Sequence, residues 1–145
     1  MKALVQRVRA ARVLVDGELV GDVGAGLCVL LGVAHTDGGA QAARLARRVA
    51  LLRIFENGEG KFDRSVVDTS GEALVVSQFT LIADTGKGNR PSFSAAARPE
   101  LAQQLYESFC EALRKEGVDV STGAFGARML VEIENEGPVT ILLET

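Results

Sequence analysis

The chain has 145 residues, of which 47% are hydrophobic and 24% are charged, and its formal net charge is −3. This composition is typical of a globular protein, and the length predicts a single domain over residues 1–145. No apolar run approaches the ~18 residues that a membrane span needs, and the acidic balance argues against a protein that coats nucleic acid indiscriminately.

The first elements are predicted to be strands. Residues 2–9 and 11–15 alternate apolar and polar side chains, and Asp16-Gly17 is a hairpin turn signal that leads into a strand over 18–23. A charged, alternating N-terminus of this kind differs from a signal peptide. We therefore expect a cytoplasmic protein.

The middle of the chain predicts a buried strand followed by a helix. The run at 27–34 is almost wholly apolar, and one face of residues 38–53 is apolar at helical spacing. Thr36 or Asp37 is a suitable cap for this helix. The stretch "ENGEGKFDRS" that comes next predicts a polar loop.

The second half predicts one more helix among strands. A strand over 73–83 precedes a loop, and Pro99 suits the first position of a helix that Gly117 ends. Three further strands are predicted, over residues 118–121, 128–135 and 139–143. The resulting order, β-β-β-α-β-α-β-β-β, predicts an α+β domain built as a curved sheet or partial barrel with two covering helices.

The strand over 73–83 contains an anomaly. Ser77, Gln78 and Thr80 surround Phe79 in a segment that otherwise predicts burial on both faces. A buried polar group without a partner costs about 1–3 kcal/mol. The pattern by itself leaves open why three polar side chains lie in this segment.

The usual catalytic groups are scarce. His35 is the only histidine and follows a strand in a loop, while Cys28 and Cys110 occupy apolar positions that predict reduced core thiols. A zinc site, a Ser-His-Asp triad and a cysteine nucleophile are therefore disfavoured. The glycines at 21–26 precede a strand instead of opening a helix, so they do not form a dinucleotide fingerprint.

Two loops admit more than one interpretation. In "GKGNRPSF", Lys87, Arg90 and Phe93 suit a phosphate or a nucleotide end, but they also suit a solvated connection. A local basic patch of this kind is compatible with a net negative chain. In "NEGPVT", the pair Gly137-Pro138 predicts a plain hairpin turn between strands on pattern alone.

Three segments together resemble the D-aminoacyl-tRNA deacylase family. They are "QRV" near the start, "SQFTL" at 77–81 and "NEGPVT" at 135–140; "LRIF" and "NRPSF" agree with them. The resemblance extends over the whole chain in the expected order. One departure is Phe62-Asp63, where methionine and asparagine are common in the family, and it affects the rim of the expected pocket.

The resemblance implies a homodimeric hydrolase that cleaves the ester between a D-amino acid and the terminal adenosine of tRNA, without metal or cofactor. It assigns the pocket and its catalytic groups to Ser77, Gln78, Phe79 and Thr80. It makes Gly137-Pro138 a cis pair that reaches into the partner's pocket and rejects L-aminoacyl substrates. An arginine at the position of Arg7 helps to hold this pair.

Alternatives remain for mechanism and function. Thr80 is one candidate nucleophile, but no base is evident, so we favour a water assisted by the 2′-hydroxyl of the RNA. The same motifs fit an inactive binder of charged tRNA, or an editing module that removes a wrong L-amino acid. Because the gate works by rejection, we expect glycyl-tRNA, including glycine mischarged on tRNA-Ala, to be a substrate.

Overall fold

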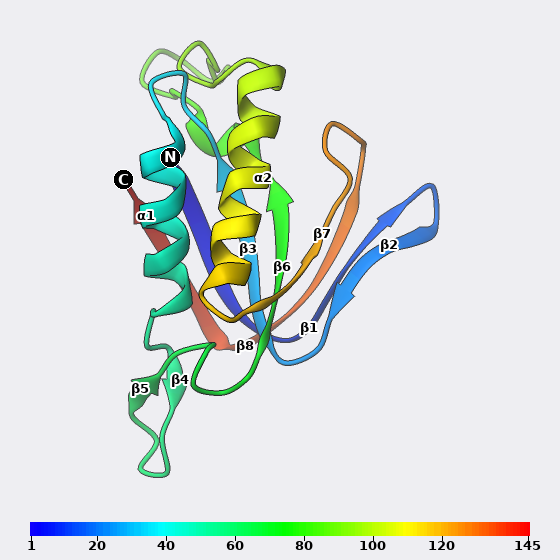
Figure 1. Cartoon of the computed structure of the whole chain (residues 1–145). Coiled ribbons are helices and arrows are strands. Elements are labelled where there is room, and N and C mark those ends of the chain that lie inside the picture. Colours follow the sequence, from blue (N-terminus) through cyan, green and yellow to red (C-terminus); the bar gives the residue numbers. More distant parts are fainter.

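The computed structural model describes all 145 residues and contains a six-stranded mixed sheet with two helices on one side and a separate two-stranded sheet (Figure 1). In chain order the elements are β1 (Lys2–Val15), β2 (Glu18–Val23), β3 (Gly26–Gly32), α1 (Gly39–Ala50), β4 (Phe55–Glu56), β5 (Phe62–Arg64), β6 (Glu72–Ser77), the 3-10 helix η1 (Phe79–Ile82), α2 (Pro99–Lys115), β7 (Asp119–Thr122) and β8 (Leu130–Glu144). No helix is both long and apolar enough to cross a membrane.

The sheet is organised around the long strand β1. Its partners are all antiparallel: β2 and β3 pair with successive parts of β1, and β8 pairs with β1 over nearly its full length. Beyond β3 lie β6 and then β7, both in parallel pairing. A Cβ at Gly21 in β2 would lie 2.3 Å from the carbonyl oxygen of Thr122 in β7, so only glycine lets these strands approach. This contact nearly closes the sheet, and the predicted curved sheet or partial barrel is confirmed.

Both helices cover the same face of the sheet and pack on each other (Figure 1). Each presents an apolar stripe at helical spacing, as the sequence predicts, with Leu45 and Val49 of α1 and Phe109 and Leu113 of α2 fully buried. They join the inward side chains of β1, β3 and β6 in the main core. A smaller apolar cluster lies on the opposite face.

Two local predictions concern the cysteines and the N-cap of α1. Cys28 and Cys110 are free and buried, which confirms the prediction of reduced core thiols. The N-cap of α1 is Gly38, so the assignment of Thr36 or Asp37 as cap is wrong. The Asp37 carboxylate instead accepts hydrogen bonds from the N-terminal amine and from the Ala34 amide, each at 2.7 Å, and thereby ties the chain start to the loop before α1.

Two predicted local structures differ in the structure. The polar loop after α1 contains a short antiparallel hairpin, in which β4 and β5 pair through Phe55–Arg64 and Glu56–Phe62. The two strands predicted over 128–135 and 139–143 are one strand, β8, and "NEGP" is not a hairpin turn. Both halves of β8 pair with β1, and the register shifts where the Gly-Pro pair lies. The neighbour β1 keeps the chain extended where the local pattern favours a turn.

Candidate active site

The first part of the candidate site lies at the end of β6. Ala73 to Val76 are at most 1% exposed, but the strand stops at Ser77, so the prediction of a strand over 73–83 is wrong in its second half. The Gln78 amide makes the last bond to β3, donating to the Leu31 carbonyl at 2.8 Å, and the chain then turns into η1. A Cβ on Gly32 would lie 3.0 Å from Cβ of Leu81, so this glycine lets η1 fold over the end of β3.

The polar residues therefore lie beyond the buried strand. Ser77 and Gln78 are half-buried, whereas Phe79 and Thr80 are exposed, Phe79 at 54%. The Gln78 side-chain amide donates to the Thr80 hydroxyl. No buried side-chain nitrogen or oxygen in the chain lacks a hydrogen-bond partner. The expected cost of burial is thus avoided, because the strand ends where its polar residues begin.

The loop "GKGNRPSF" folds onto this segment. Asp84 and Ser92 exchange two backbone hydrogen bonds of 2.8 and 2.9 Å that close the base of the loop. The Phe93 ring then meets the Phe79 ring edge-on, with centroids 5.0 Å apart. Lys87 and Arg90 are exposed on the loop and make no ion pair. The structure thus places the predicted segment Ser77 to Thr80 beside Phe93, on a loop that also carries Lys87 and Arg90.

The Gly137-Pro138 segment forms a second, separate part of the candidate site. Its peptide bond is cis, and both residues are exposed. The Val139 amide donates to the Asn135 side chain at 2.9 Å, which spans the pair. Gly137 has φ of +128°, and an added Cβ would lie 2.9 Å from Val139 and 3.1 Å from Arg7. Glycine is the residue that fits this backbone and space.

The buried side chain of Arg7 supports this segment by a hydrogen bond to its backbone. Its side chain is only 8% exposed, and its guanidinium donates to the carbonyl oxygens of Glu136 at 3.2 Å and Ile54 at 2.8 Å. The Phe62 ring lies 5.6 Å from the guanidinium carbon, and the Glu56 carboxylate lies 3.8 Å from Nη2. A buried charge is tolerated here because several acceptors surround it.

The sequence interpretation did not connect Ile54, Glu56 and Phe62 with Arg7. Ile54 precedes the β4–β5 hairpin, and Glu56 and Phe62 lie within it, in the stretch that the pattern assigned to a polar loop. The available signal was Phe62, an aromatic residue inside an otherwise polar stretch. Its ring covers the Arg7 guanidinium, so the hairpin is part of the support of the Gly-Pro pair.

The two parts do not meet within one chain. Ser77 pairs with Leu31, and Leu31 pairs with Ala3 near the start of β1, whereas Gly137-Pro138 lies beside Arg7. Ala3 and Arg7 lie four residues apart on β1, which corresponds to roughly 13 Å along the strand. The three spacings between the neighbouring strands β6, β3, β1 and β8 add about 14 Å across the sheet. A ligand at Phe79 therefore does not touch the Gly-Pro pair of the same chain.

The remaining reactive groups are unsuited to catalysis. Burial raises the pKa of the Cys28 thiol to about 12 and that of Cys110 to about 11, so neither forms a thiolate near neutral pH. His35 is exposed in its loop. The structure contains no group of three or more histidine, cysteine or acidic side chains placed to hold a metal ion.

With this geometry in place, comparisons with known proteins identify the family. A family model described as "D-Tyr-tRNA(Tyr) deacylase" matches residues 4–144. A protein of Chloroflexus aurantiacus named "D-aminoacyl-tRNA deacylase" is 55% identical over 145 residues, covering 100% of this chain and 91% of the relative. One of the same name from Idiomarina loihiensis is 56% identical over 144 residues, covering 99% of each.

Solved structures agree on the fold. The structure titled "c-Myc DNA Unwinding Element Binding Protein" superimposes with a TM-score of 0.94 at 46% identity and covers 100% of this chain and 99% of its own. One titled "Structural Analysis of a probable eukaryotic D-amino acid tRNA deacylase" has a TM-score of 0.84 at 20% identity, with 98% and 97% covered, and supports the fold alone. The chain belongs to the D-aminoacyl-tRNA deacylase family. It is an enzyme of the hydrolase class, as the resemblance of its motifs implies.

Proposed function

We propose that the protein hydrolyses the ester that joins a D-amino acid, or glycine, to the terminal adenosine of tRNA, and that it rejects L-aminoacyl esters. Glycine mischarged on tRNA-Ala is then among its substrates. The observation that carries the proposal is the pair of exposed segments, one with stacking rings and free cations and one with the Gly137-Pro138 pair held by Arg7. Because the proposed substrate is charged tRNA, we expect this hydrolysis to take place in the cytoplasm.

The segment at the end of β6, with the loop that folds onto it, suits a nucleotide end. Phe79 and Phe93 provide aromatic surfaces for the adenine, and Lys87 and Arg90 lie on the same loop for the phosphates. Ser77, Gln78 and Thr80 supply hydrogen-bonding groups around the ester. The amides of Gln78 and Leu81 are engaged, so those between them, at Phe79 and Thr80, are the candidate donors to the ester oxygen in the transition state.

Chemistry at the ester then needs little from side chains. An aminoacyl ester is labile, and orientation with stabilisation of the oxyanion supplies large rate gains. In this mechanism the 2′-hydroxyl of the RNA assists the attacking water, and the protein holds both in place. The cysteines with raised pKa support this route over one that uses a protein nucleophile.

A homodimer accounts for the separation of the two site parts. The face of the sheet opposite the helices carries a row of apolar side chains at matching register, from Val76 through Leu30 and Leu4 to Leu142. Leu142 is 49% exposed in the single chain. A second copy that covers this row buries it, and the Gly137-Pro138 turn of one subunit then reaches the Phe79 pocket of its partner. Activity should fall on dilution when subunits dissociate, and a fully active monomer excludes this arrangement.

The proposed selection for D-aminoacyl substrates works by steric rejection of L side chains. When the carbonyl oxygens of Gly137 and Pro138 hold the substrate ammonium, exchange of configuration at Cα directs an L side chain into the turn. Glycine has no side chain to clash, and a D-alanyl methyl adds only about 1 kcal/mol of apolar burial. Cleavage of D-alanyl- and glycyl-tRNA should therefore differ by less than about tenfold.

The test compares D-alanyl-, glycyl- and L-alanyl-tRNA at equal enzyme concentration. The proposal expects rapid release of D-alanine and glycine and almost none of L-alanine. Binding of D-alanyl-tRNA without turnover would instead identify an inactive binder. Resistance of glycyl-tRNA equal to that of L-alanyl-tRNA contradicts the rejection mechanism, and preferential cleavage of L-alanyl-tRNA identifies an L-editing module.

A further inference from the structure

Helix α1 carries a concentration of positive charge that the proposed reaction does not use. Arg44, Arg47 and Arg48 are all exposed, and the helix contains no acidic residue. They occupy i, i+3 and i+4 positions, within about 6 Å along the helix axis. Arg53 follows shortly after the helix ends. The chain as a whole has a net charge of −3, so this cluster stands out from its average.

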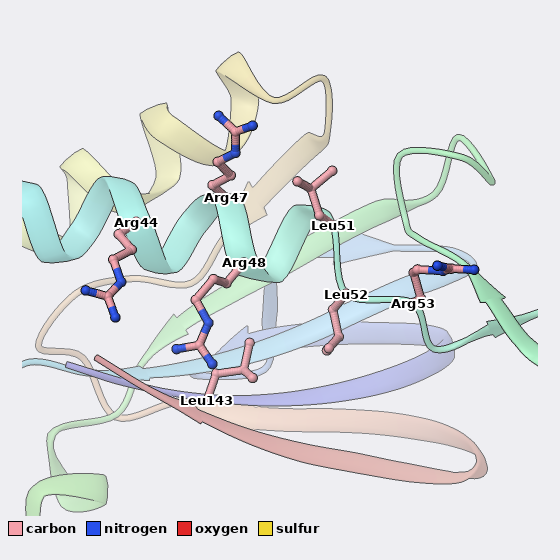
Figure 2. A pocket seen from close by; sticks show the side chains of 7 residues that line it. All are labelled: Arg44, Arg47, Arg48, Leu51, Leu52, Arg53 and Leu143. Carbon is pink, nitrogen blue, oxygen red and sulfur yellow. The ribbon is translucent and has the colours of Figure 1, made fainter.

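The arginines surround a groove with an apolar floor. The groove has a volume of about 610 Å³, and Leu51, Leu52 and Leu143 line it together with the four arginines. Figure 2 shows Arg44 and Arg48 extending to the same side of α1, toward Leu143 on β8, while Arg47 and Leu51 extend to the other side. Exposed guanidinium groups next to leucine side chains suit a ligand with anionic groups on an apolar body.

Two of these cations have no partner in the chain. Arg44 and Arg47 make no side-chain hydrogen bond and no ion pair. Arg48 donates to the backbone carbonyl of Glu144, a neutral acceptor, and the Glu144 carboxylate is taken by Lys2 at 3.4 Å. Arg53 pairs with Asp63.

The arginines of β1 provide an internal contrast. Arg7, Arg9 and Arg12 each face a glutamate of a neighbouring segment. The charge of the α1 cluster is left without such neutralisation. The negative end of the helix dipole favours Arg47 and Arg48 in the last turn, but it does not account for Arg44 one turn earlier.

The helix that carries the arginines is linked to the loop of the candidate site. The segment before α1 bonds to the end of that loop: the His35 amide donates to the Ala95 carbonyl at 3.0 Å, and Ala34 bridges Ala96. Figure 1 shows the first turn of α1 beside this loop and the last turn near the β4–β5 hairpin. The helix is about 18 Å long at 1.5 Å per residue. The segment before α1 thus connects the helix to the loop that carries Lys87 and Arg90.

We propose that the groove formed by Arg44, Arg47, Arg48 and Arg53 binds backbone phosphates of the tRNA substrate, away from its aminoacylated 3′ end. The planar guanidinium forks match phosphate oxygens, and the leucine floor accepts sugar faces. The inference rests on the proposed function, because the tRNA is the partner that enters the Phe79 pocket. It adds a second contact that distinguishes a whole tRNA from its terminal aminoacyl-adenosine.

The test uses the double variant Arg44→Gln/Arg47→Gln. Neither arginine bonds within the chain, and glutamine is compatible with a helix, so the fold should be retained. The matched control is Lys115→Gln/Arg128→Gln. It removes the same amount of charge at two exposed residues outside the groove, neither of which makes an ion pair. Steady-state kinetics are measured with D-alanyl-tRNA and with D-alanyl-adenosine, and binding of deacylated tRNA is measured at several salt concentrations.

We expect the KM for D-alanyl-tRNA to rise about tenfold in the double variant, with kcat and the kinetics on D-alanyl-adenosine unchanged. The slope of log affinity against log salt for deacylated tRNA should fall by about two, one for each lost phosphate contact. An unchanged KM and slope overturn the proposal. An equal loss in the control variant, or an equal loss on D-alanyl-adenosine, also overturns it.

The readouts separate this inference from the proposed function. If the wild-type protein cleaves neither substrate, the proposed function fails, and the salt slope for deacylated tRNA still decides whether the groove binds phosphates. If the wild type cleaves both substrates and the double variant binds tRNA as the wild type does, only the groove is excluded.

Discussion

The two exposed parts of the candidate site are held in opposite ways. Around Gly137-Pro138, a buried arginine, a side-chain amide from Asn135 and the ring of Phe62 fix the backbone from several sides. Around Phe79, the rings of Phe79 and Phe93 meet edge-on, and Gln78 donates one hydrogen bond to Thr80. One part is clamped before any ligand arrives, while the other is open.

This difference fits the tasks that we propose for the two parts. A gate that rejects by steric clash must not yield, since a shift of about 1 Å makes room for the wrong configuration. A surface that stacks on a base gains from rings that are accessible. Substitutions around Gly137-Pro138 should therefore change the stability of the fold, and substitutions around Phe79 should change activity alone.

The largest effect is expected for Arg7→Ala. The substitution leaves the carbonyls of Ile54 and Glu136 without their donor, so the free energy of unfolding should fall by about 3 kcal/mol. The Gly-Pro turn loses its support, and deacylation of D-alanyl-tRNA should fall at least about a hundredfold. Urea unfolding and steady-state kinetics measure the two losses.

Arg9→Ala is the matched control on the same strand. The Arg9 side chain is 75% exposed and bonds only the Glu136 carboxylate, so its loss should change stability by less than about 0.5 kcal/mol. Equal losses in the two variants contradict a special role for Arg7.

Gly137→Ala should have the next largest effect. A side chain at φ of +128° is strained, and its Cβ meets Val139 at 2.9 Å, so we expect a loss of about 2 kcal/mol together with a fall in kcat/KM. Gly58→Ala is the control, since nothing lies within 4 Å of the added carbon and its φ is not in the left-handed region. A neutral Gly137→Ala variant would show that the turn is not rigid.

Phe79→Ala should separate activity from stability. The ring is 54% exposed, so the unfolding free energy should change by no more than about 1 kcal/mol, while kcat/KM for D-alanyl-tRNA falls about tenfold. Leu19→Ala, at a residue 57% exposed on β2, is the control and should leave both quantities unchanged. Full activity of Phe79→Ala removes the stacking surface from the pocket.

The smallest effect is expected for Thr80→Ala. Thr80 is exposed and its hydroxyl only accepts from Gln78, so deacylation should stay within about fivefold of the wild type. Single-turnover kinetics and mass spectrometry provide the measurement. An acyl group trapped on Thr80 would refute the mechanism without a covalent intermediate.

Local chain direction was the weakest part of the sequence prediction. Residues 77–83 have apolar neighbours that favour a strand, yet the chain leaves the sheet at Ser77 because β3 ends there and Gly32 gives η1 room. Glu136-Gly137-Pro138 has turn residues, yet β8 continues because β1 pairs with both of its halves. In both places a neighbouring strand, remote in sequence, decides the outcome.

The sequence by itself determined the class of fold, the apolar faces of both helices and the motifs that indicate a deacylase, because periodicity and short motifs are properties of neighbouring residues. The support of Arg7 by Ile54 and Phe62, the pairing of Phe79 with Phe93 and the separation of the pocket from its gate were decided only by tertiary structure. These contacts join residues far apart in the chain, and strand register and loop closure set them. The local sequence pattern does not determine that register.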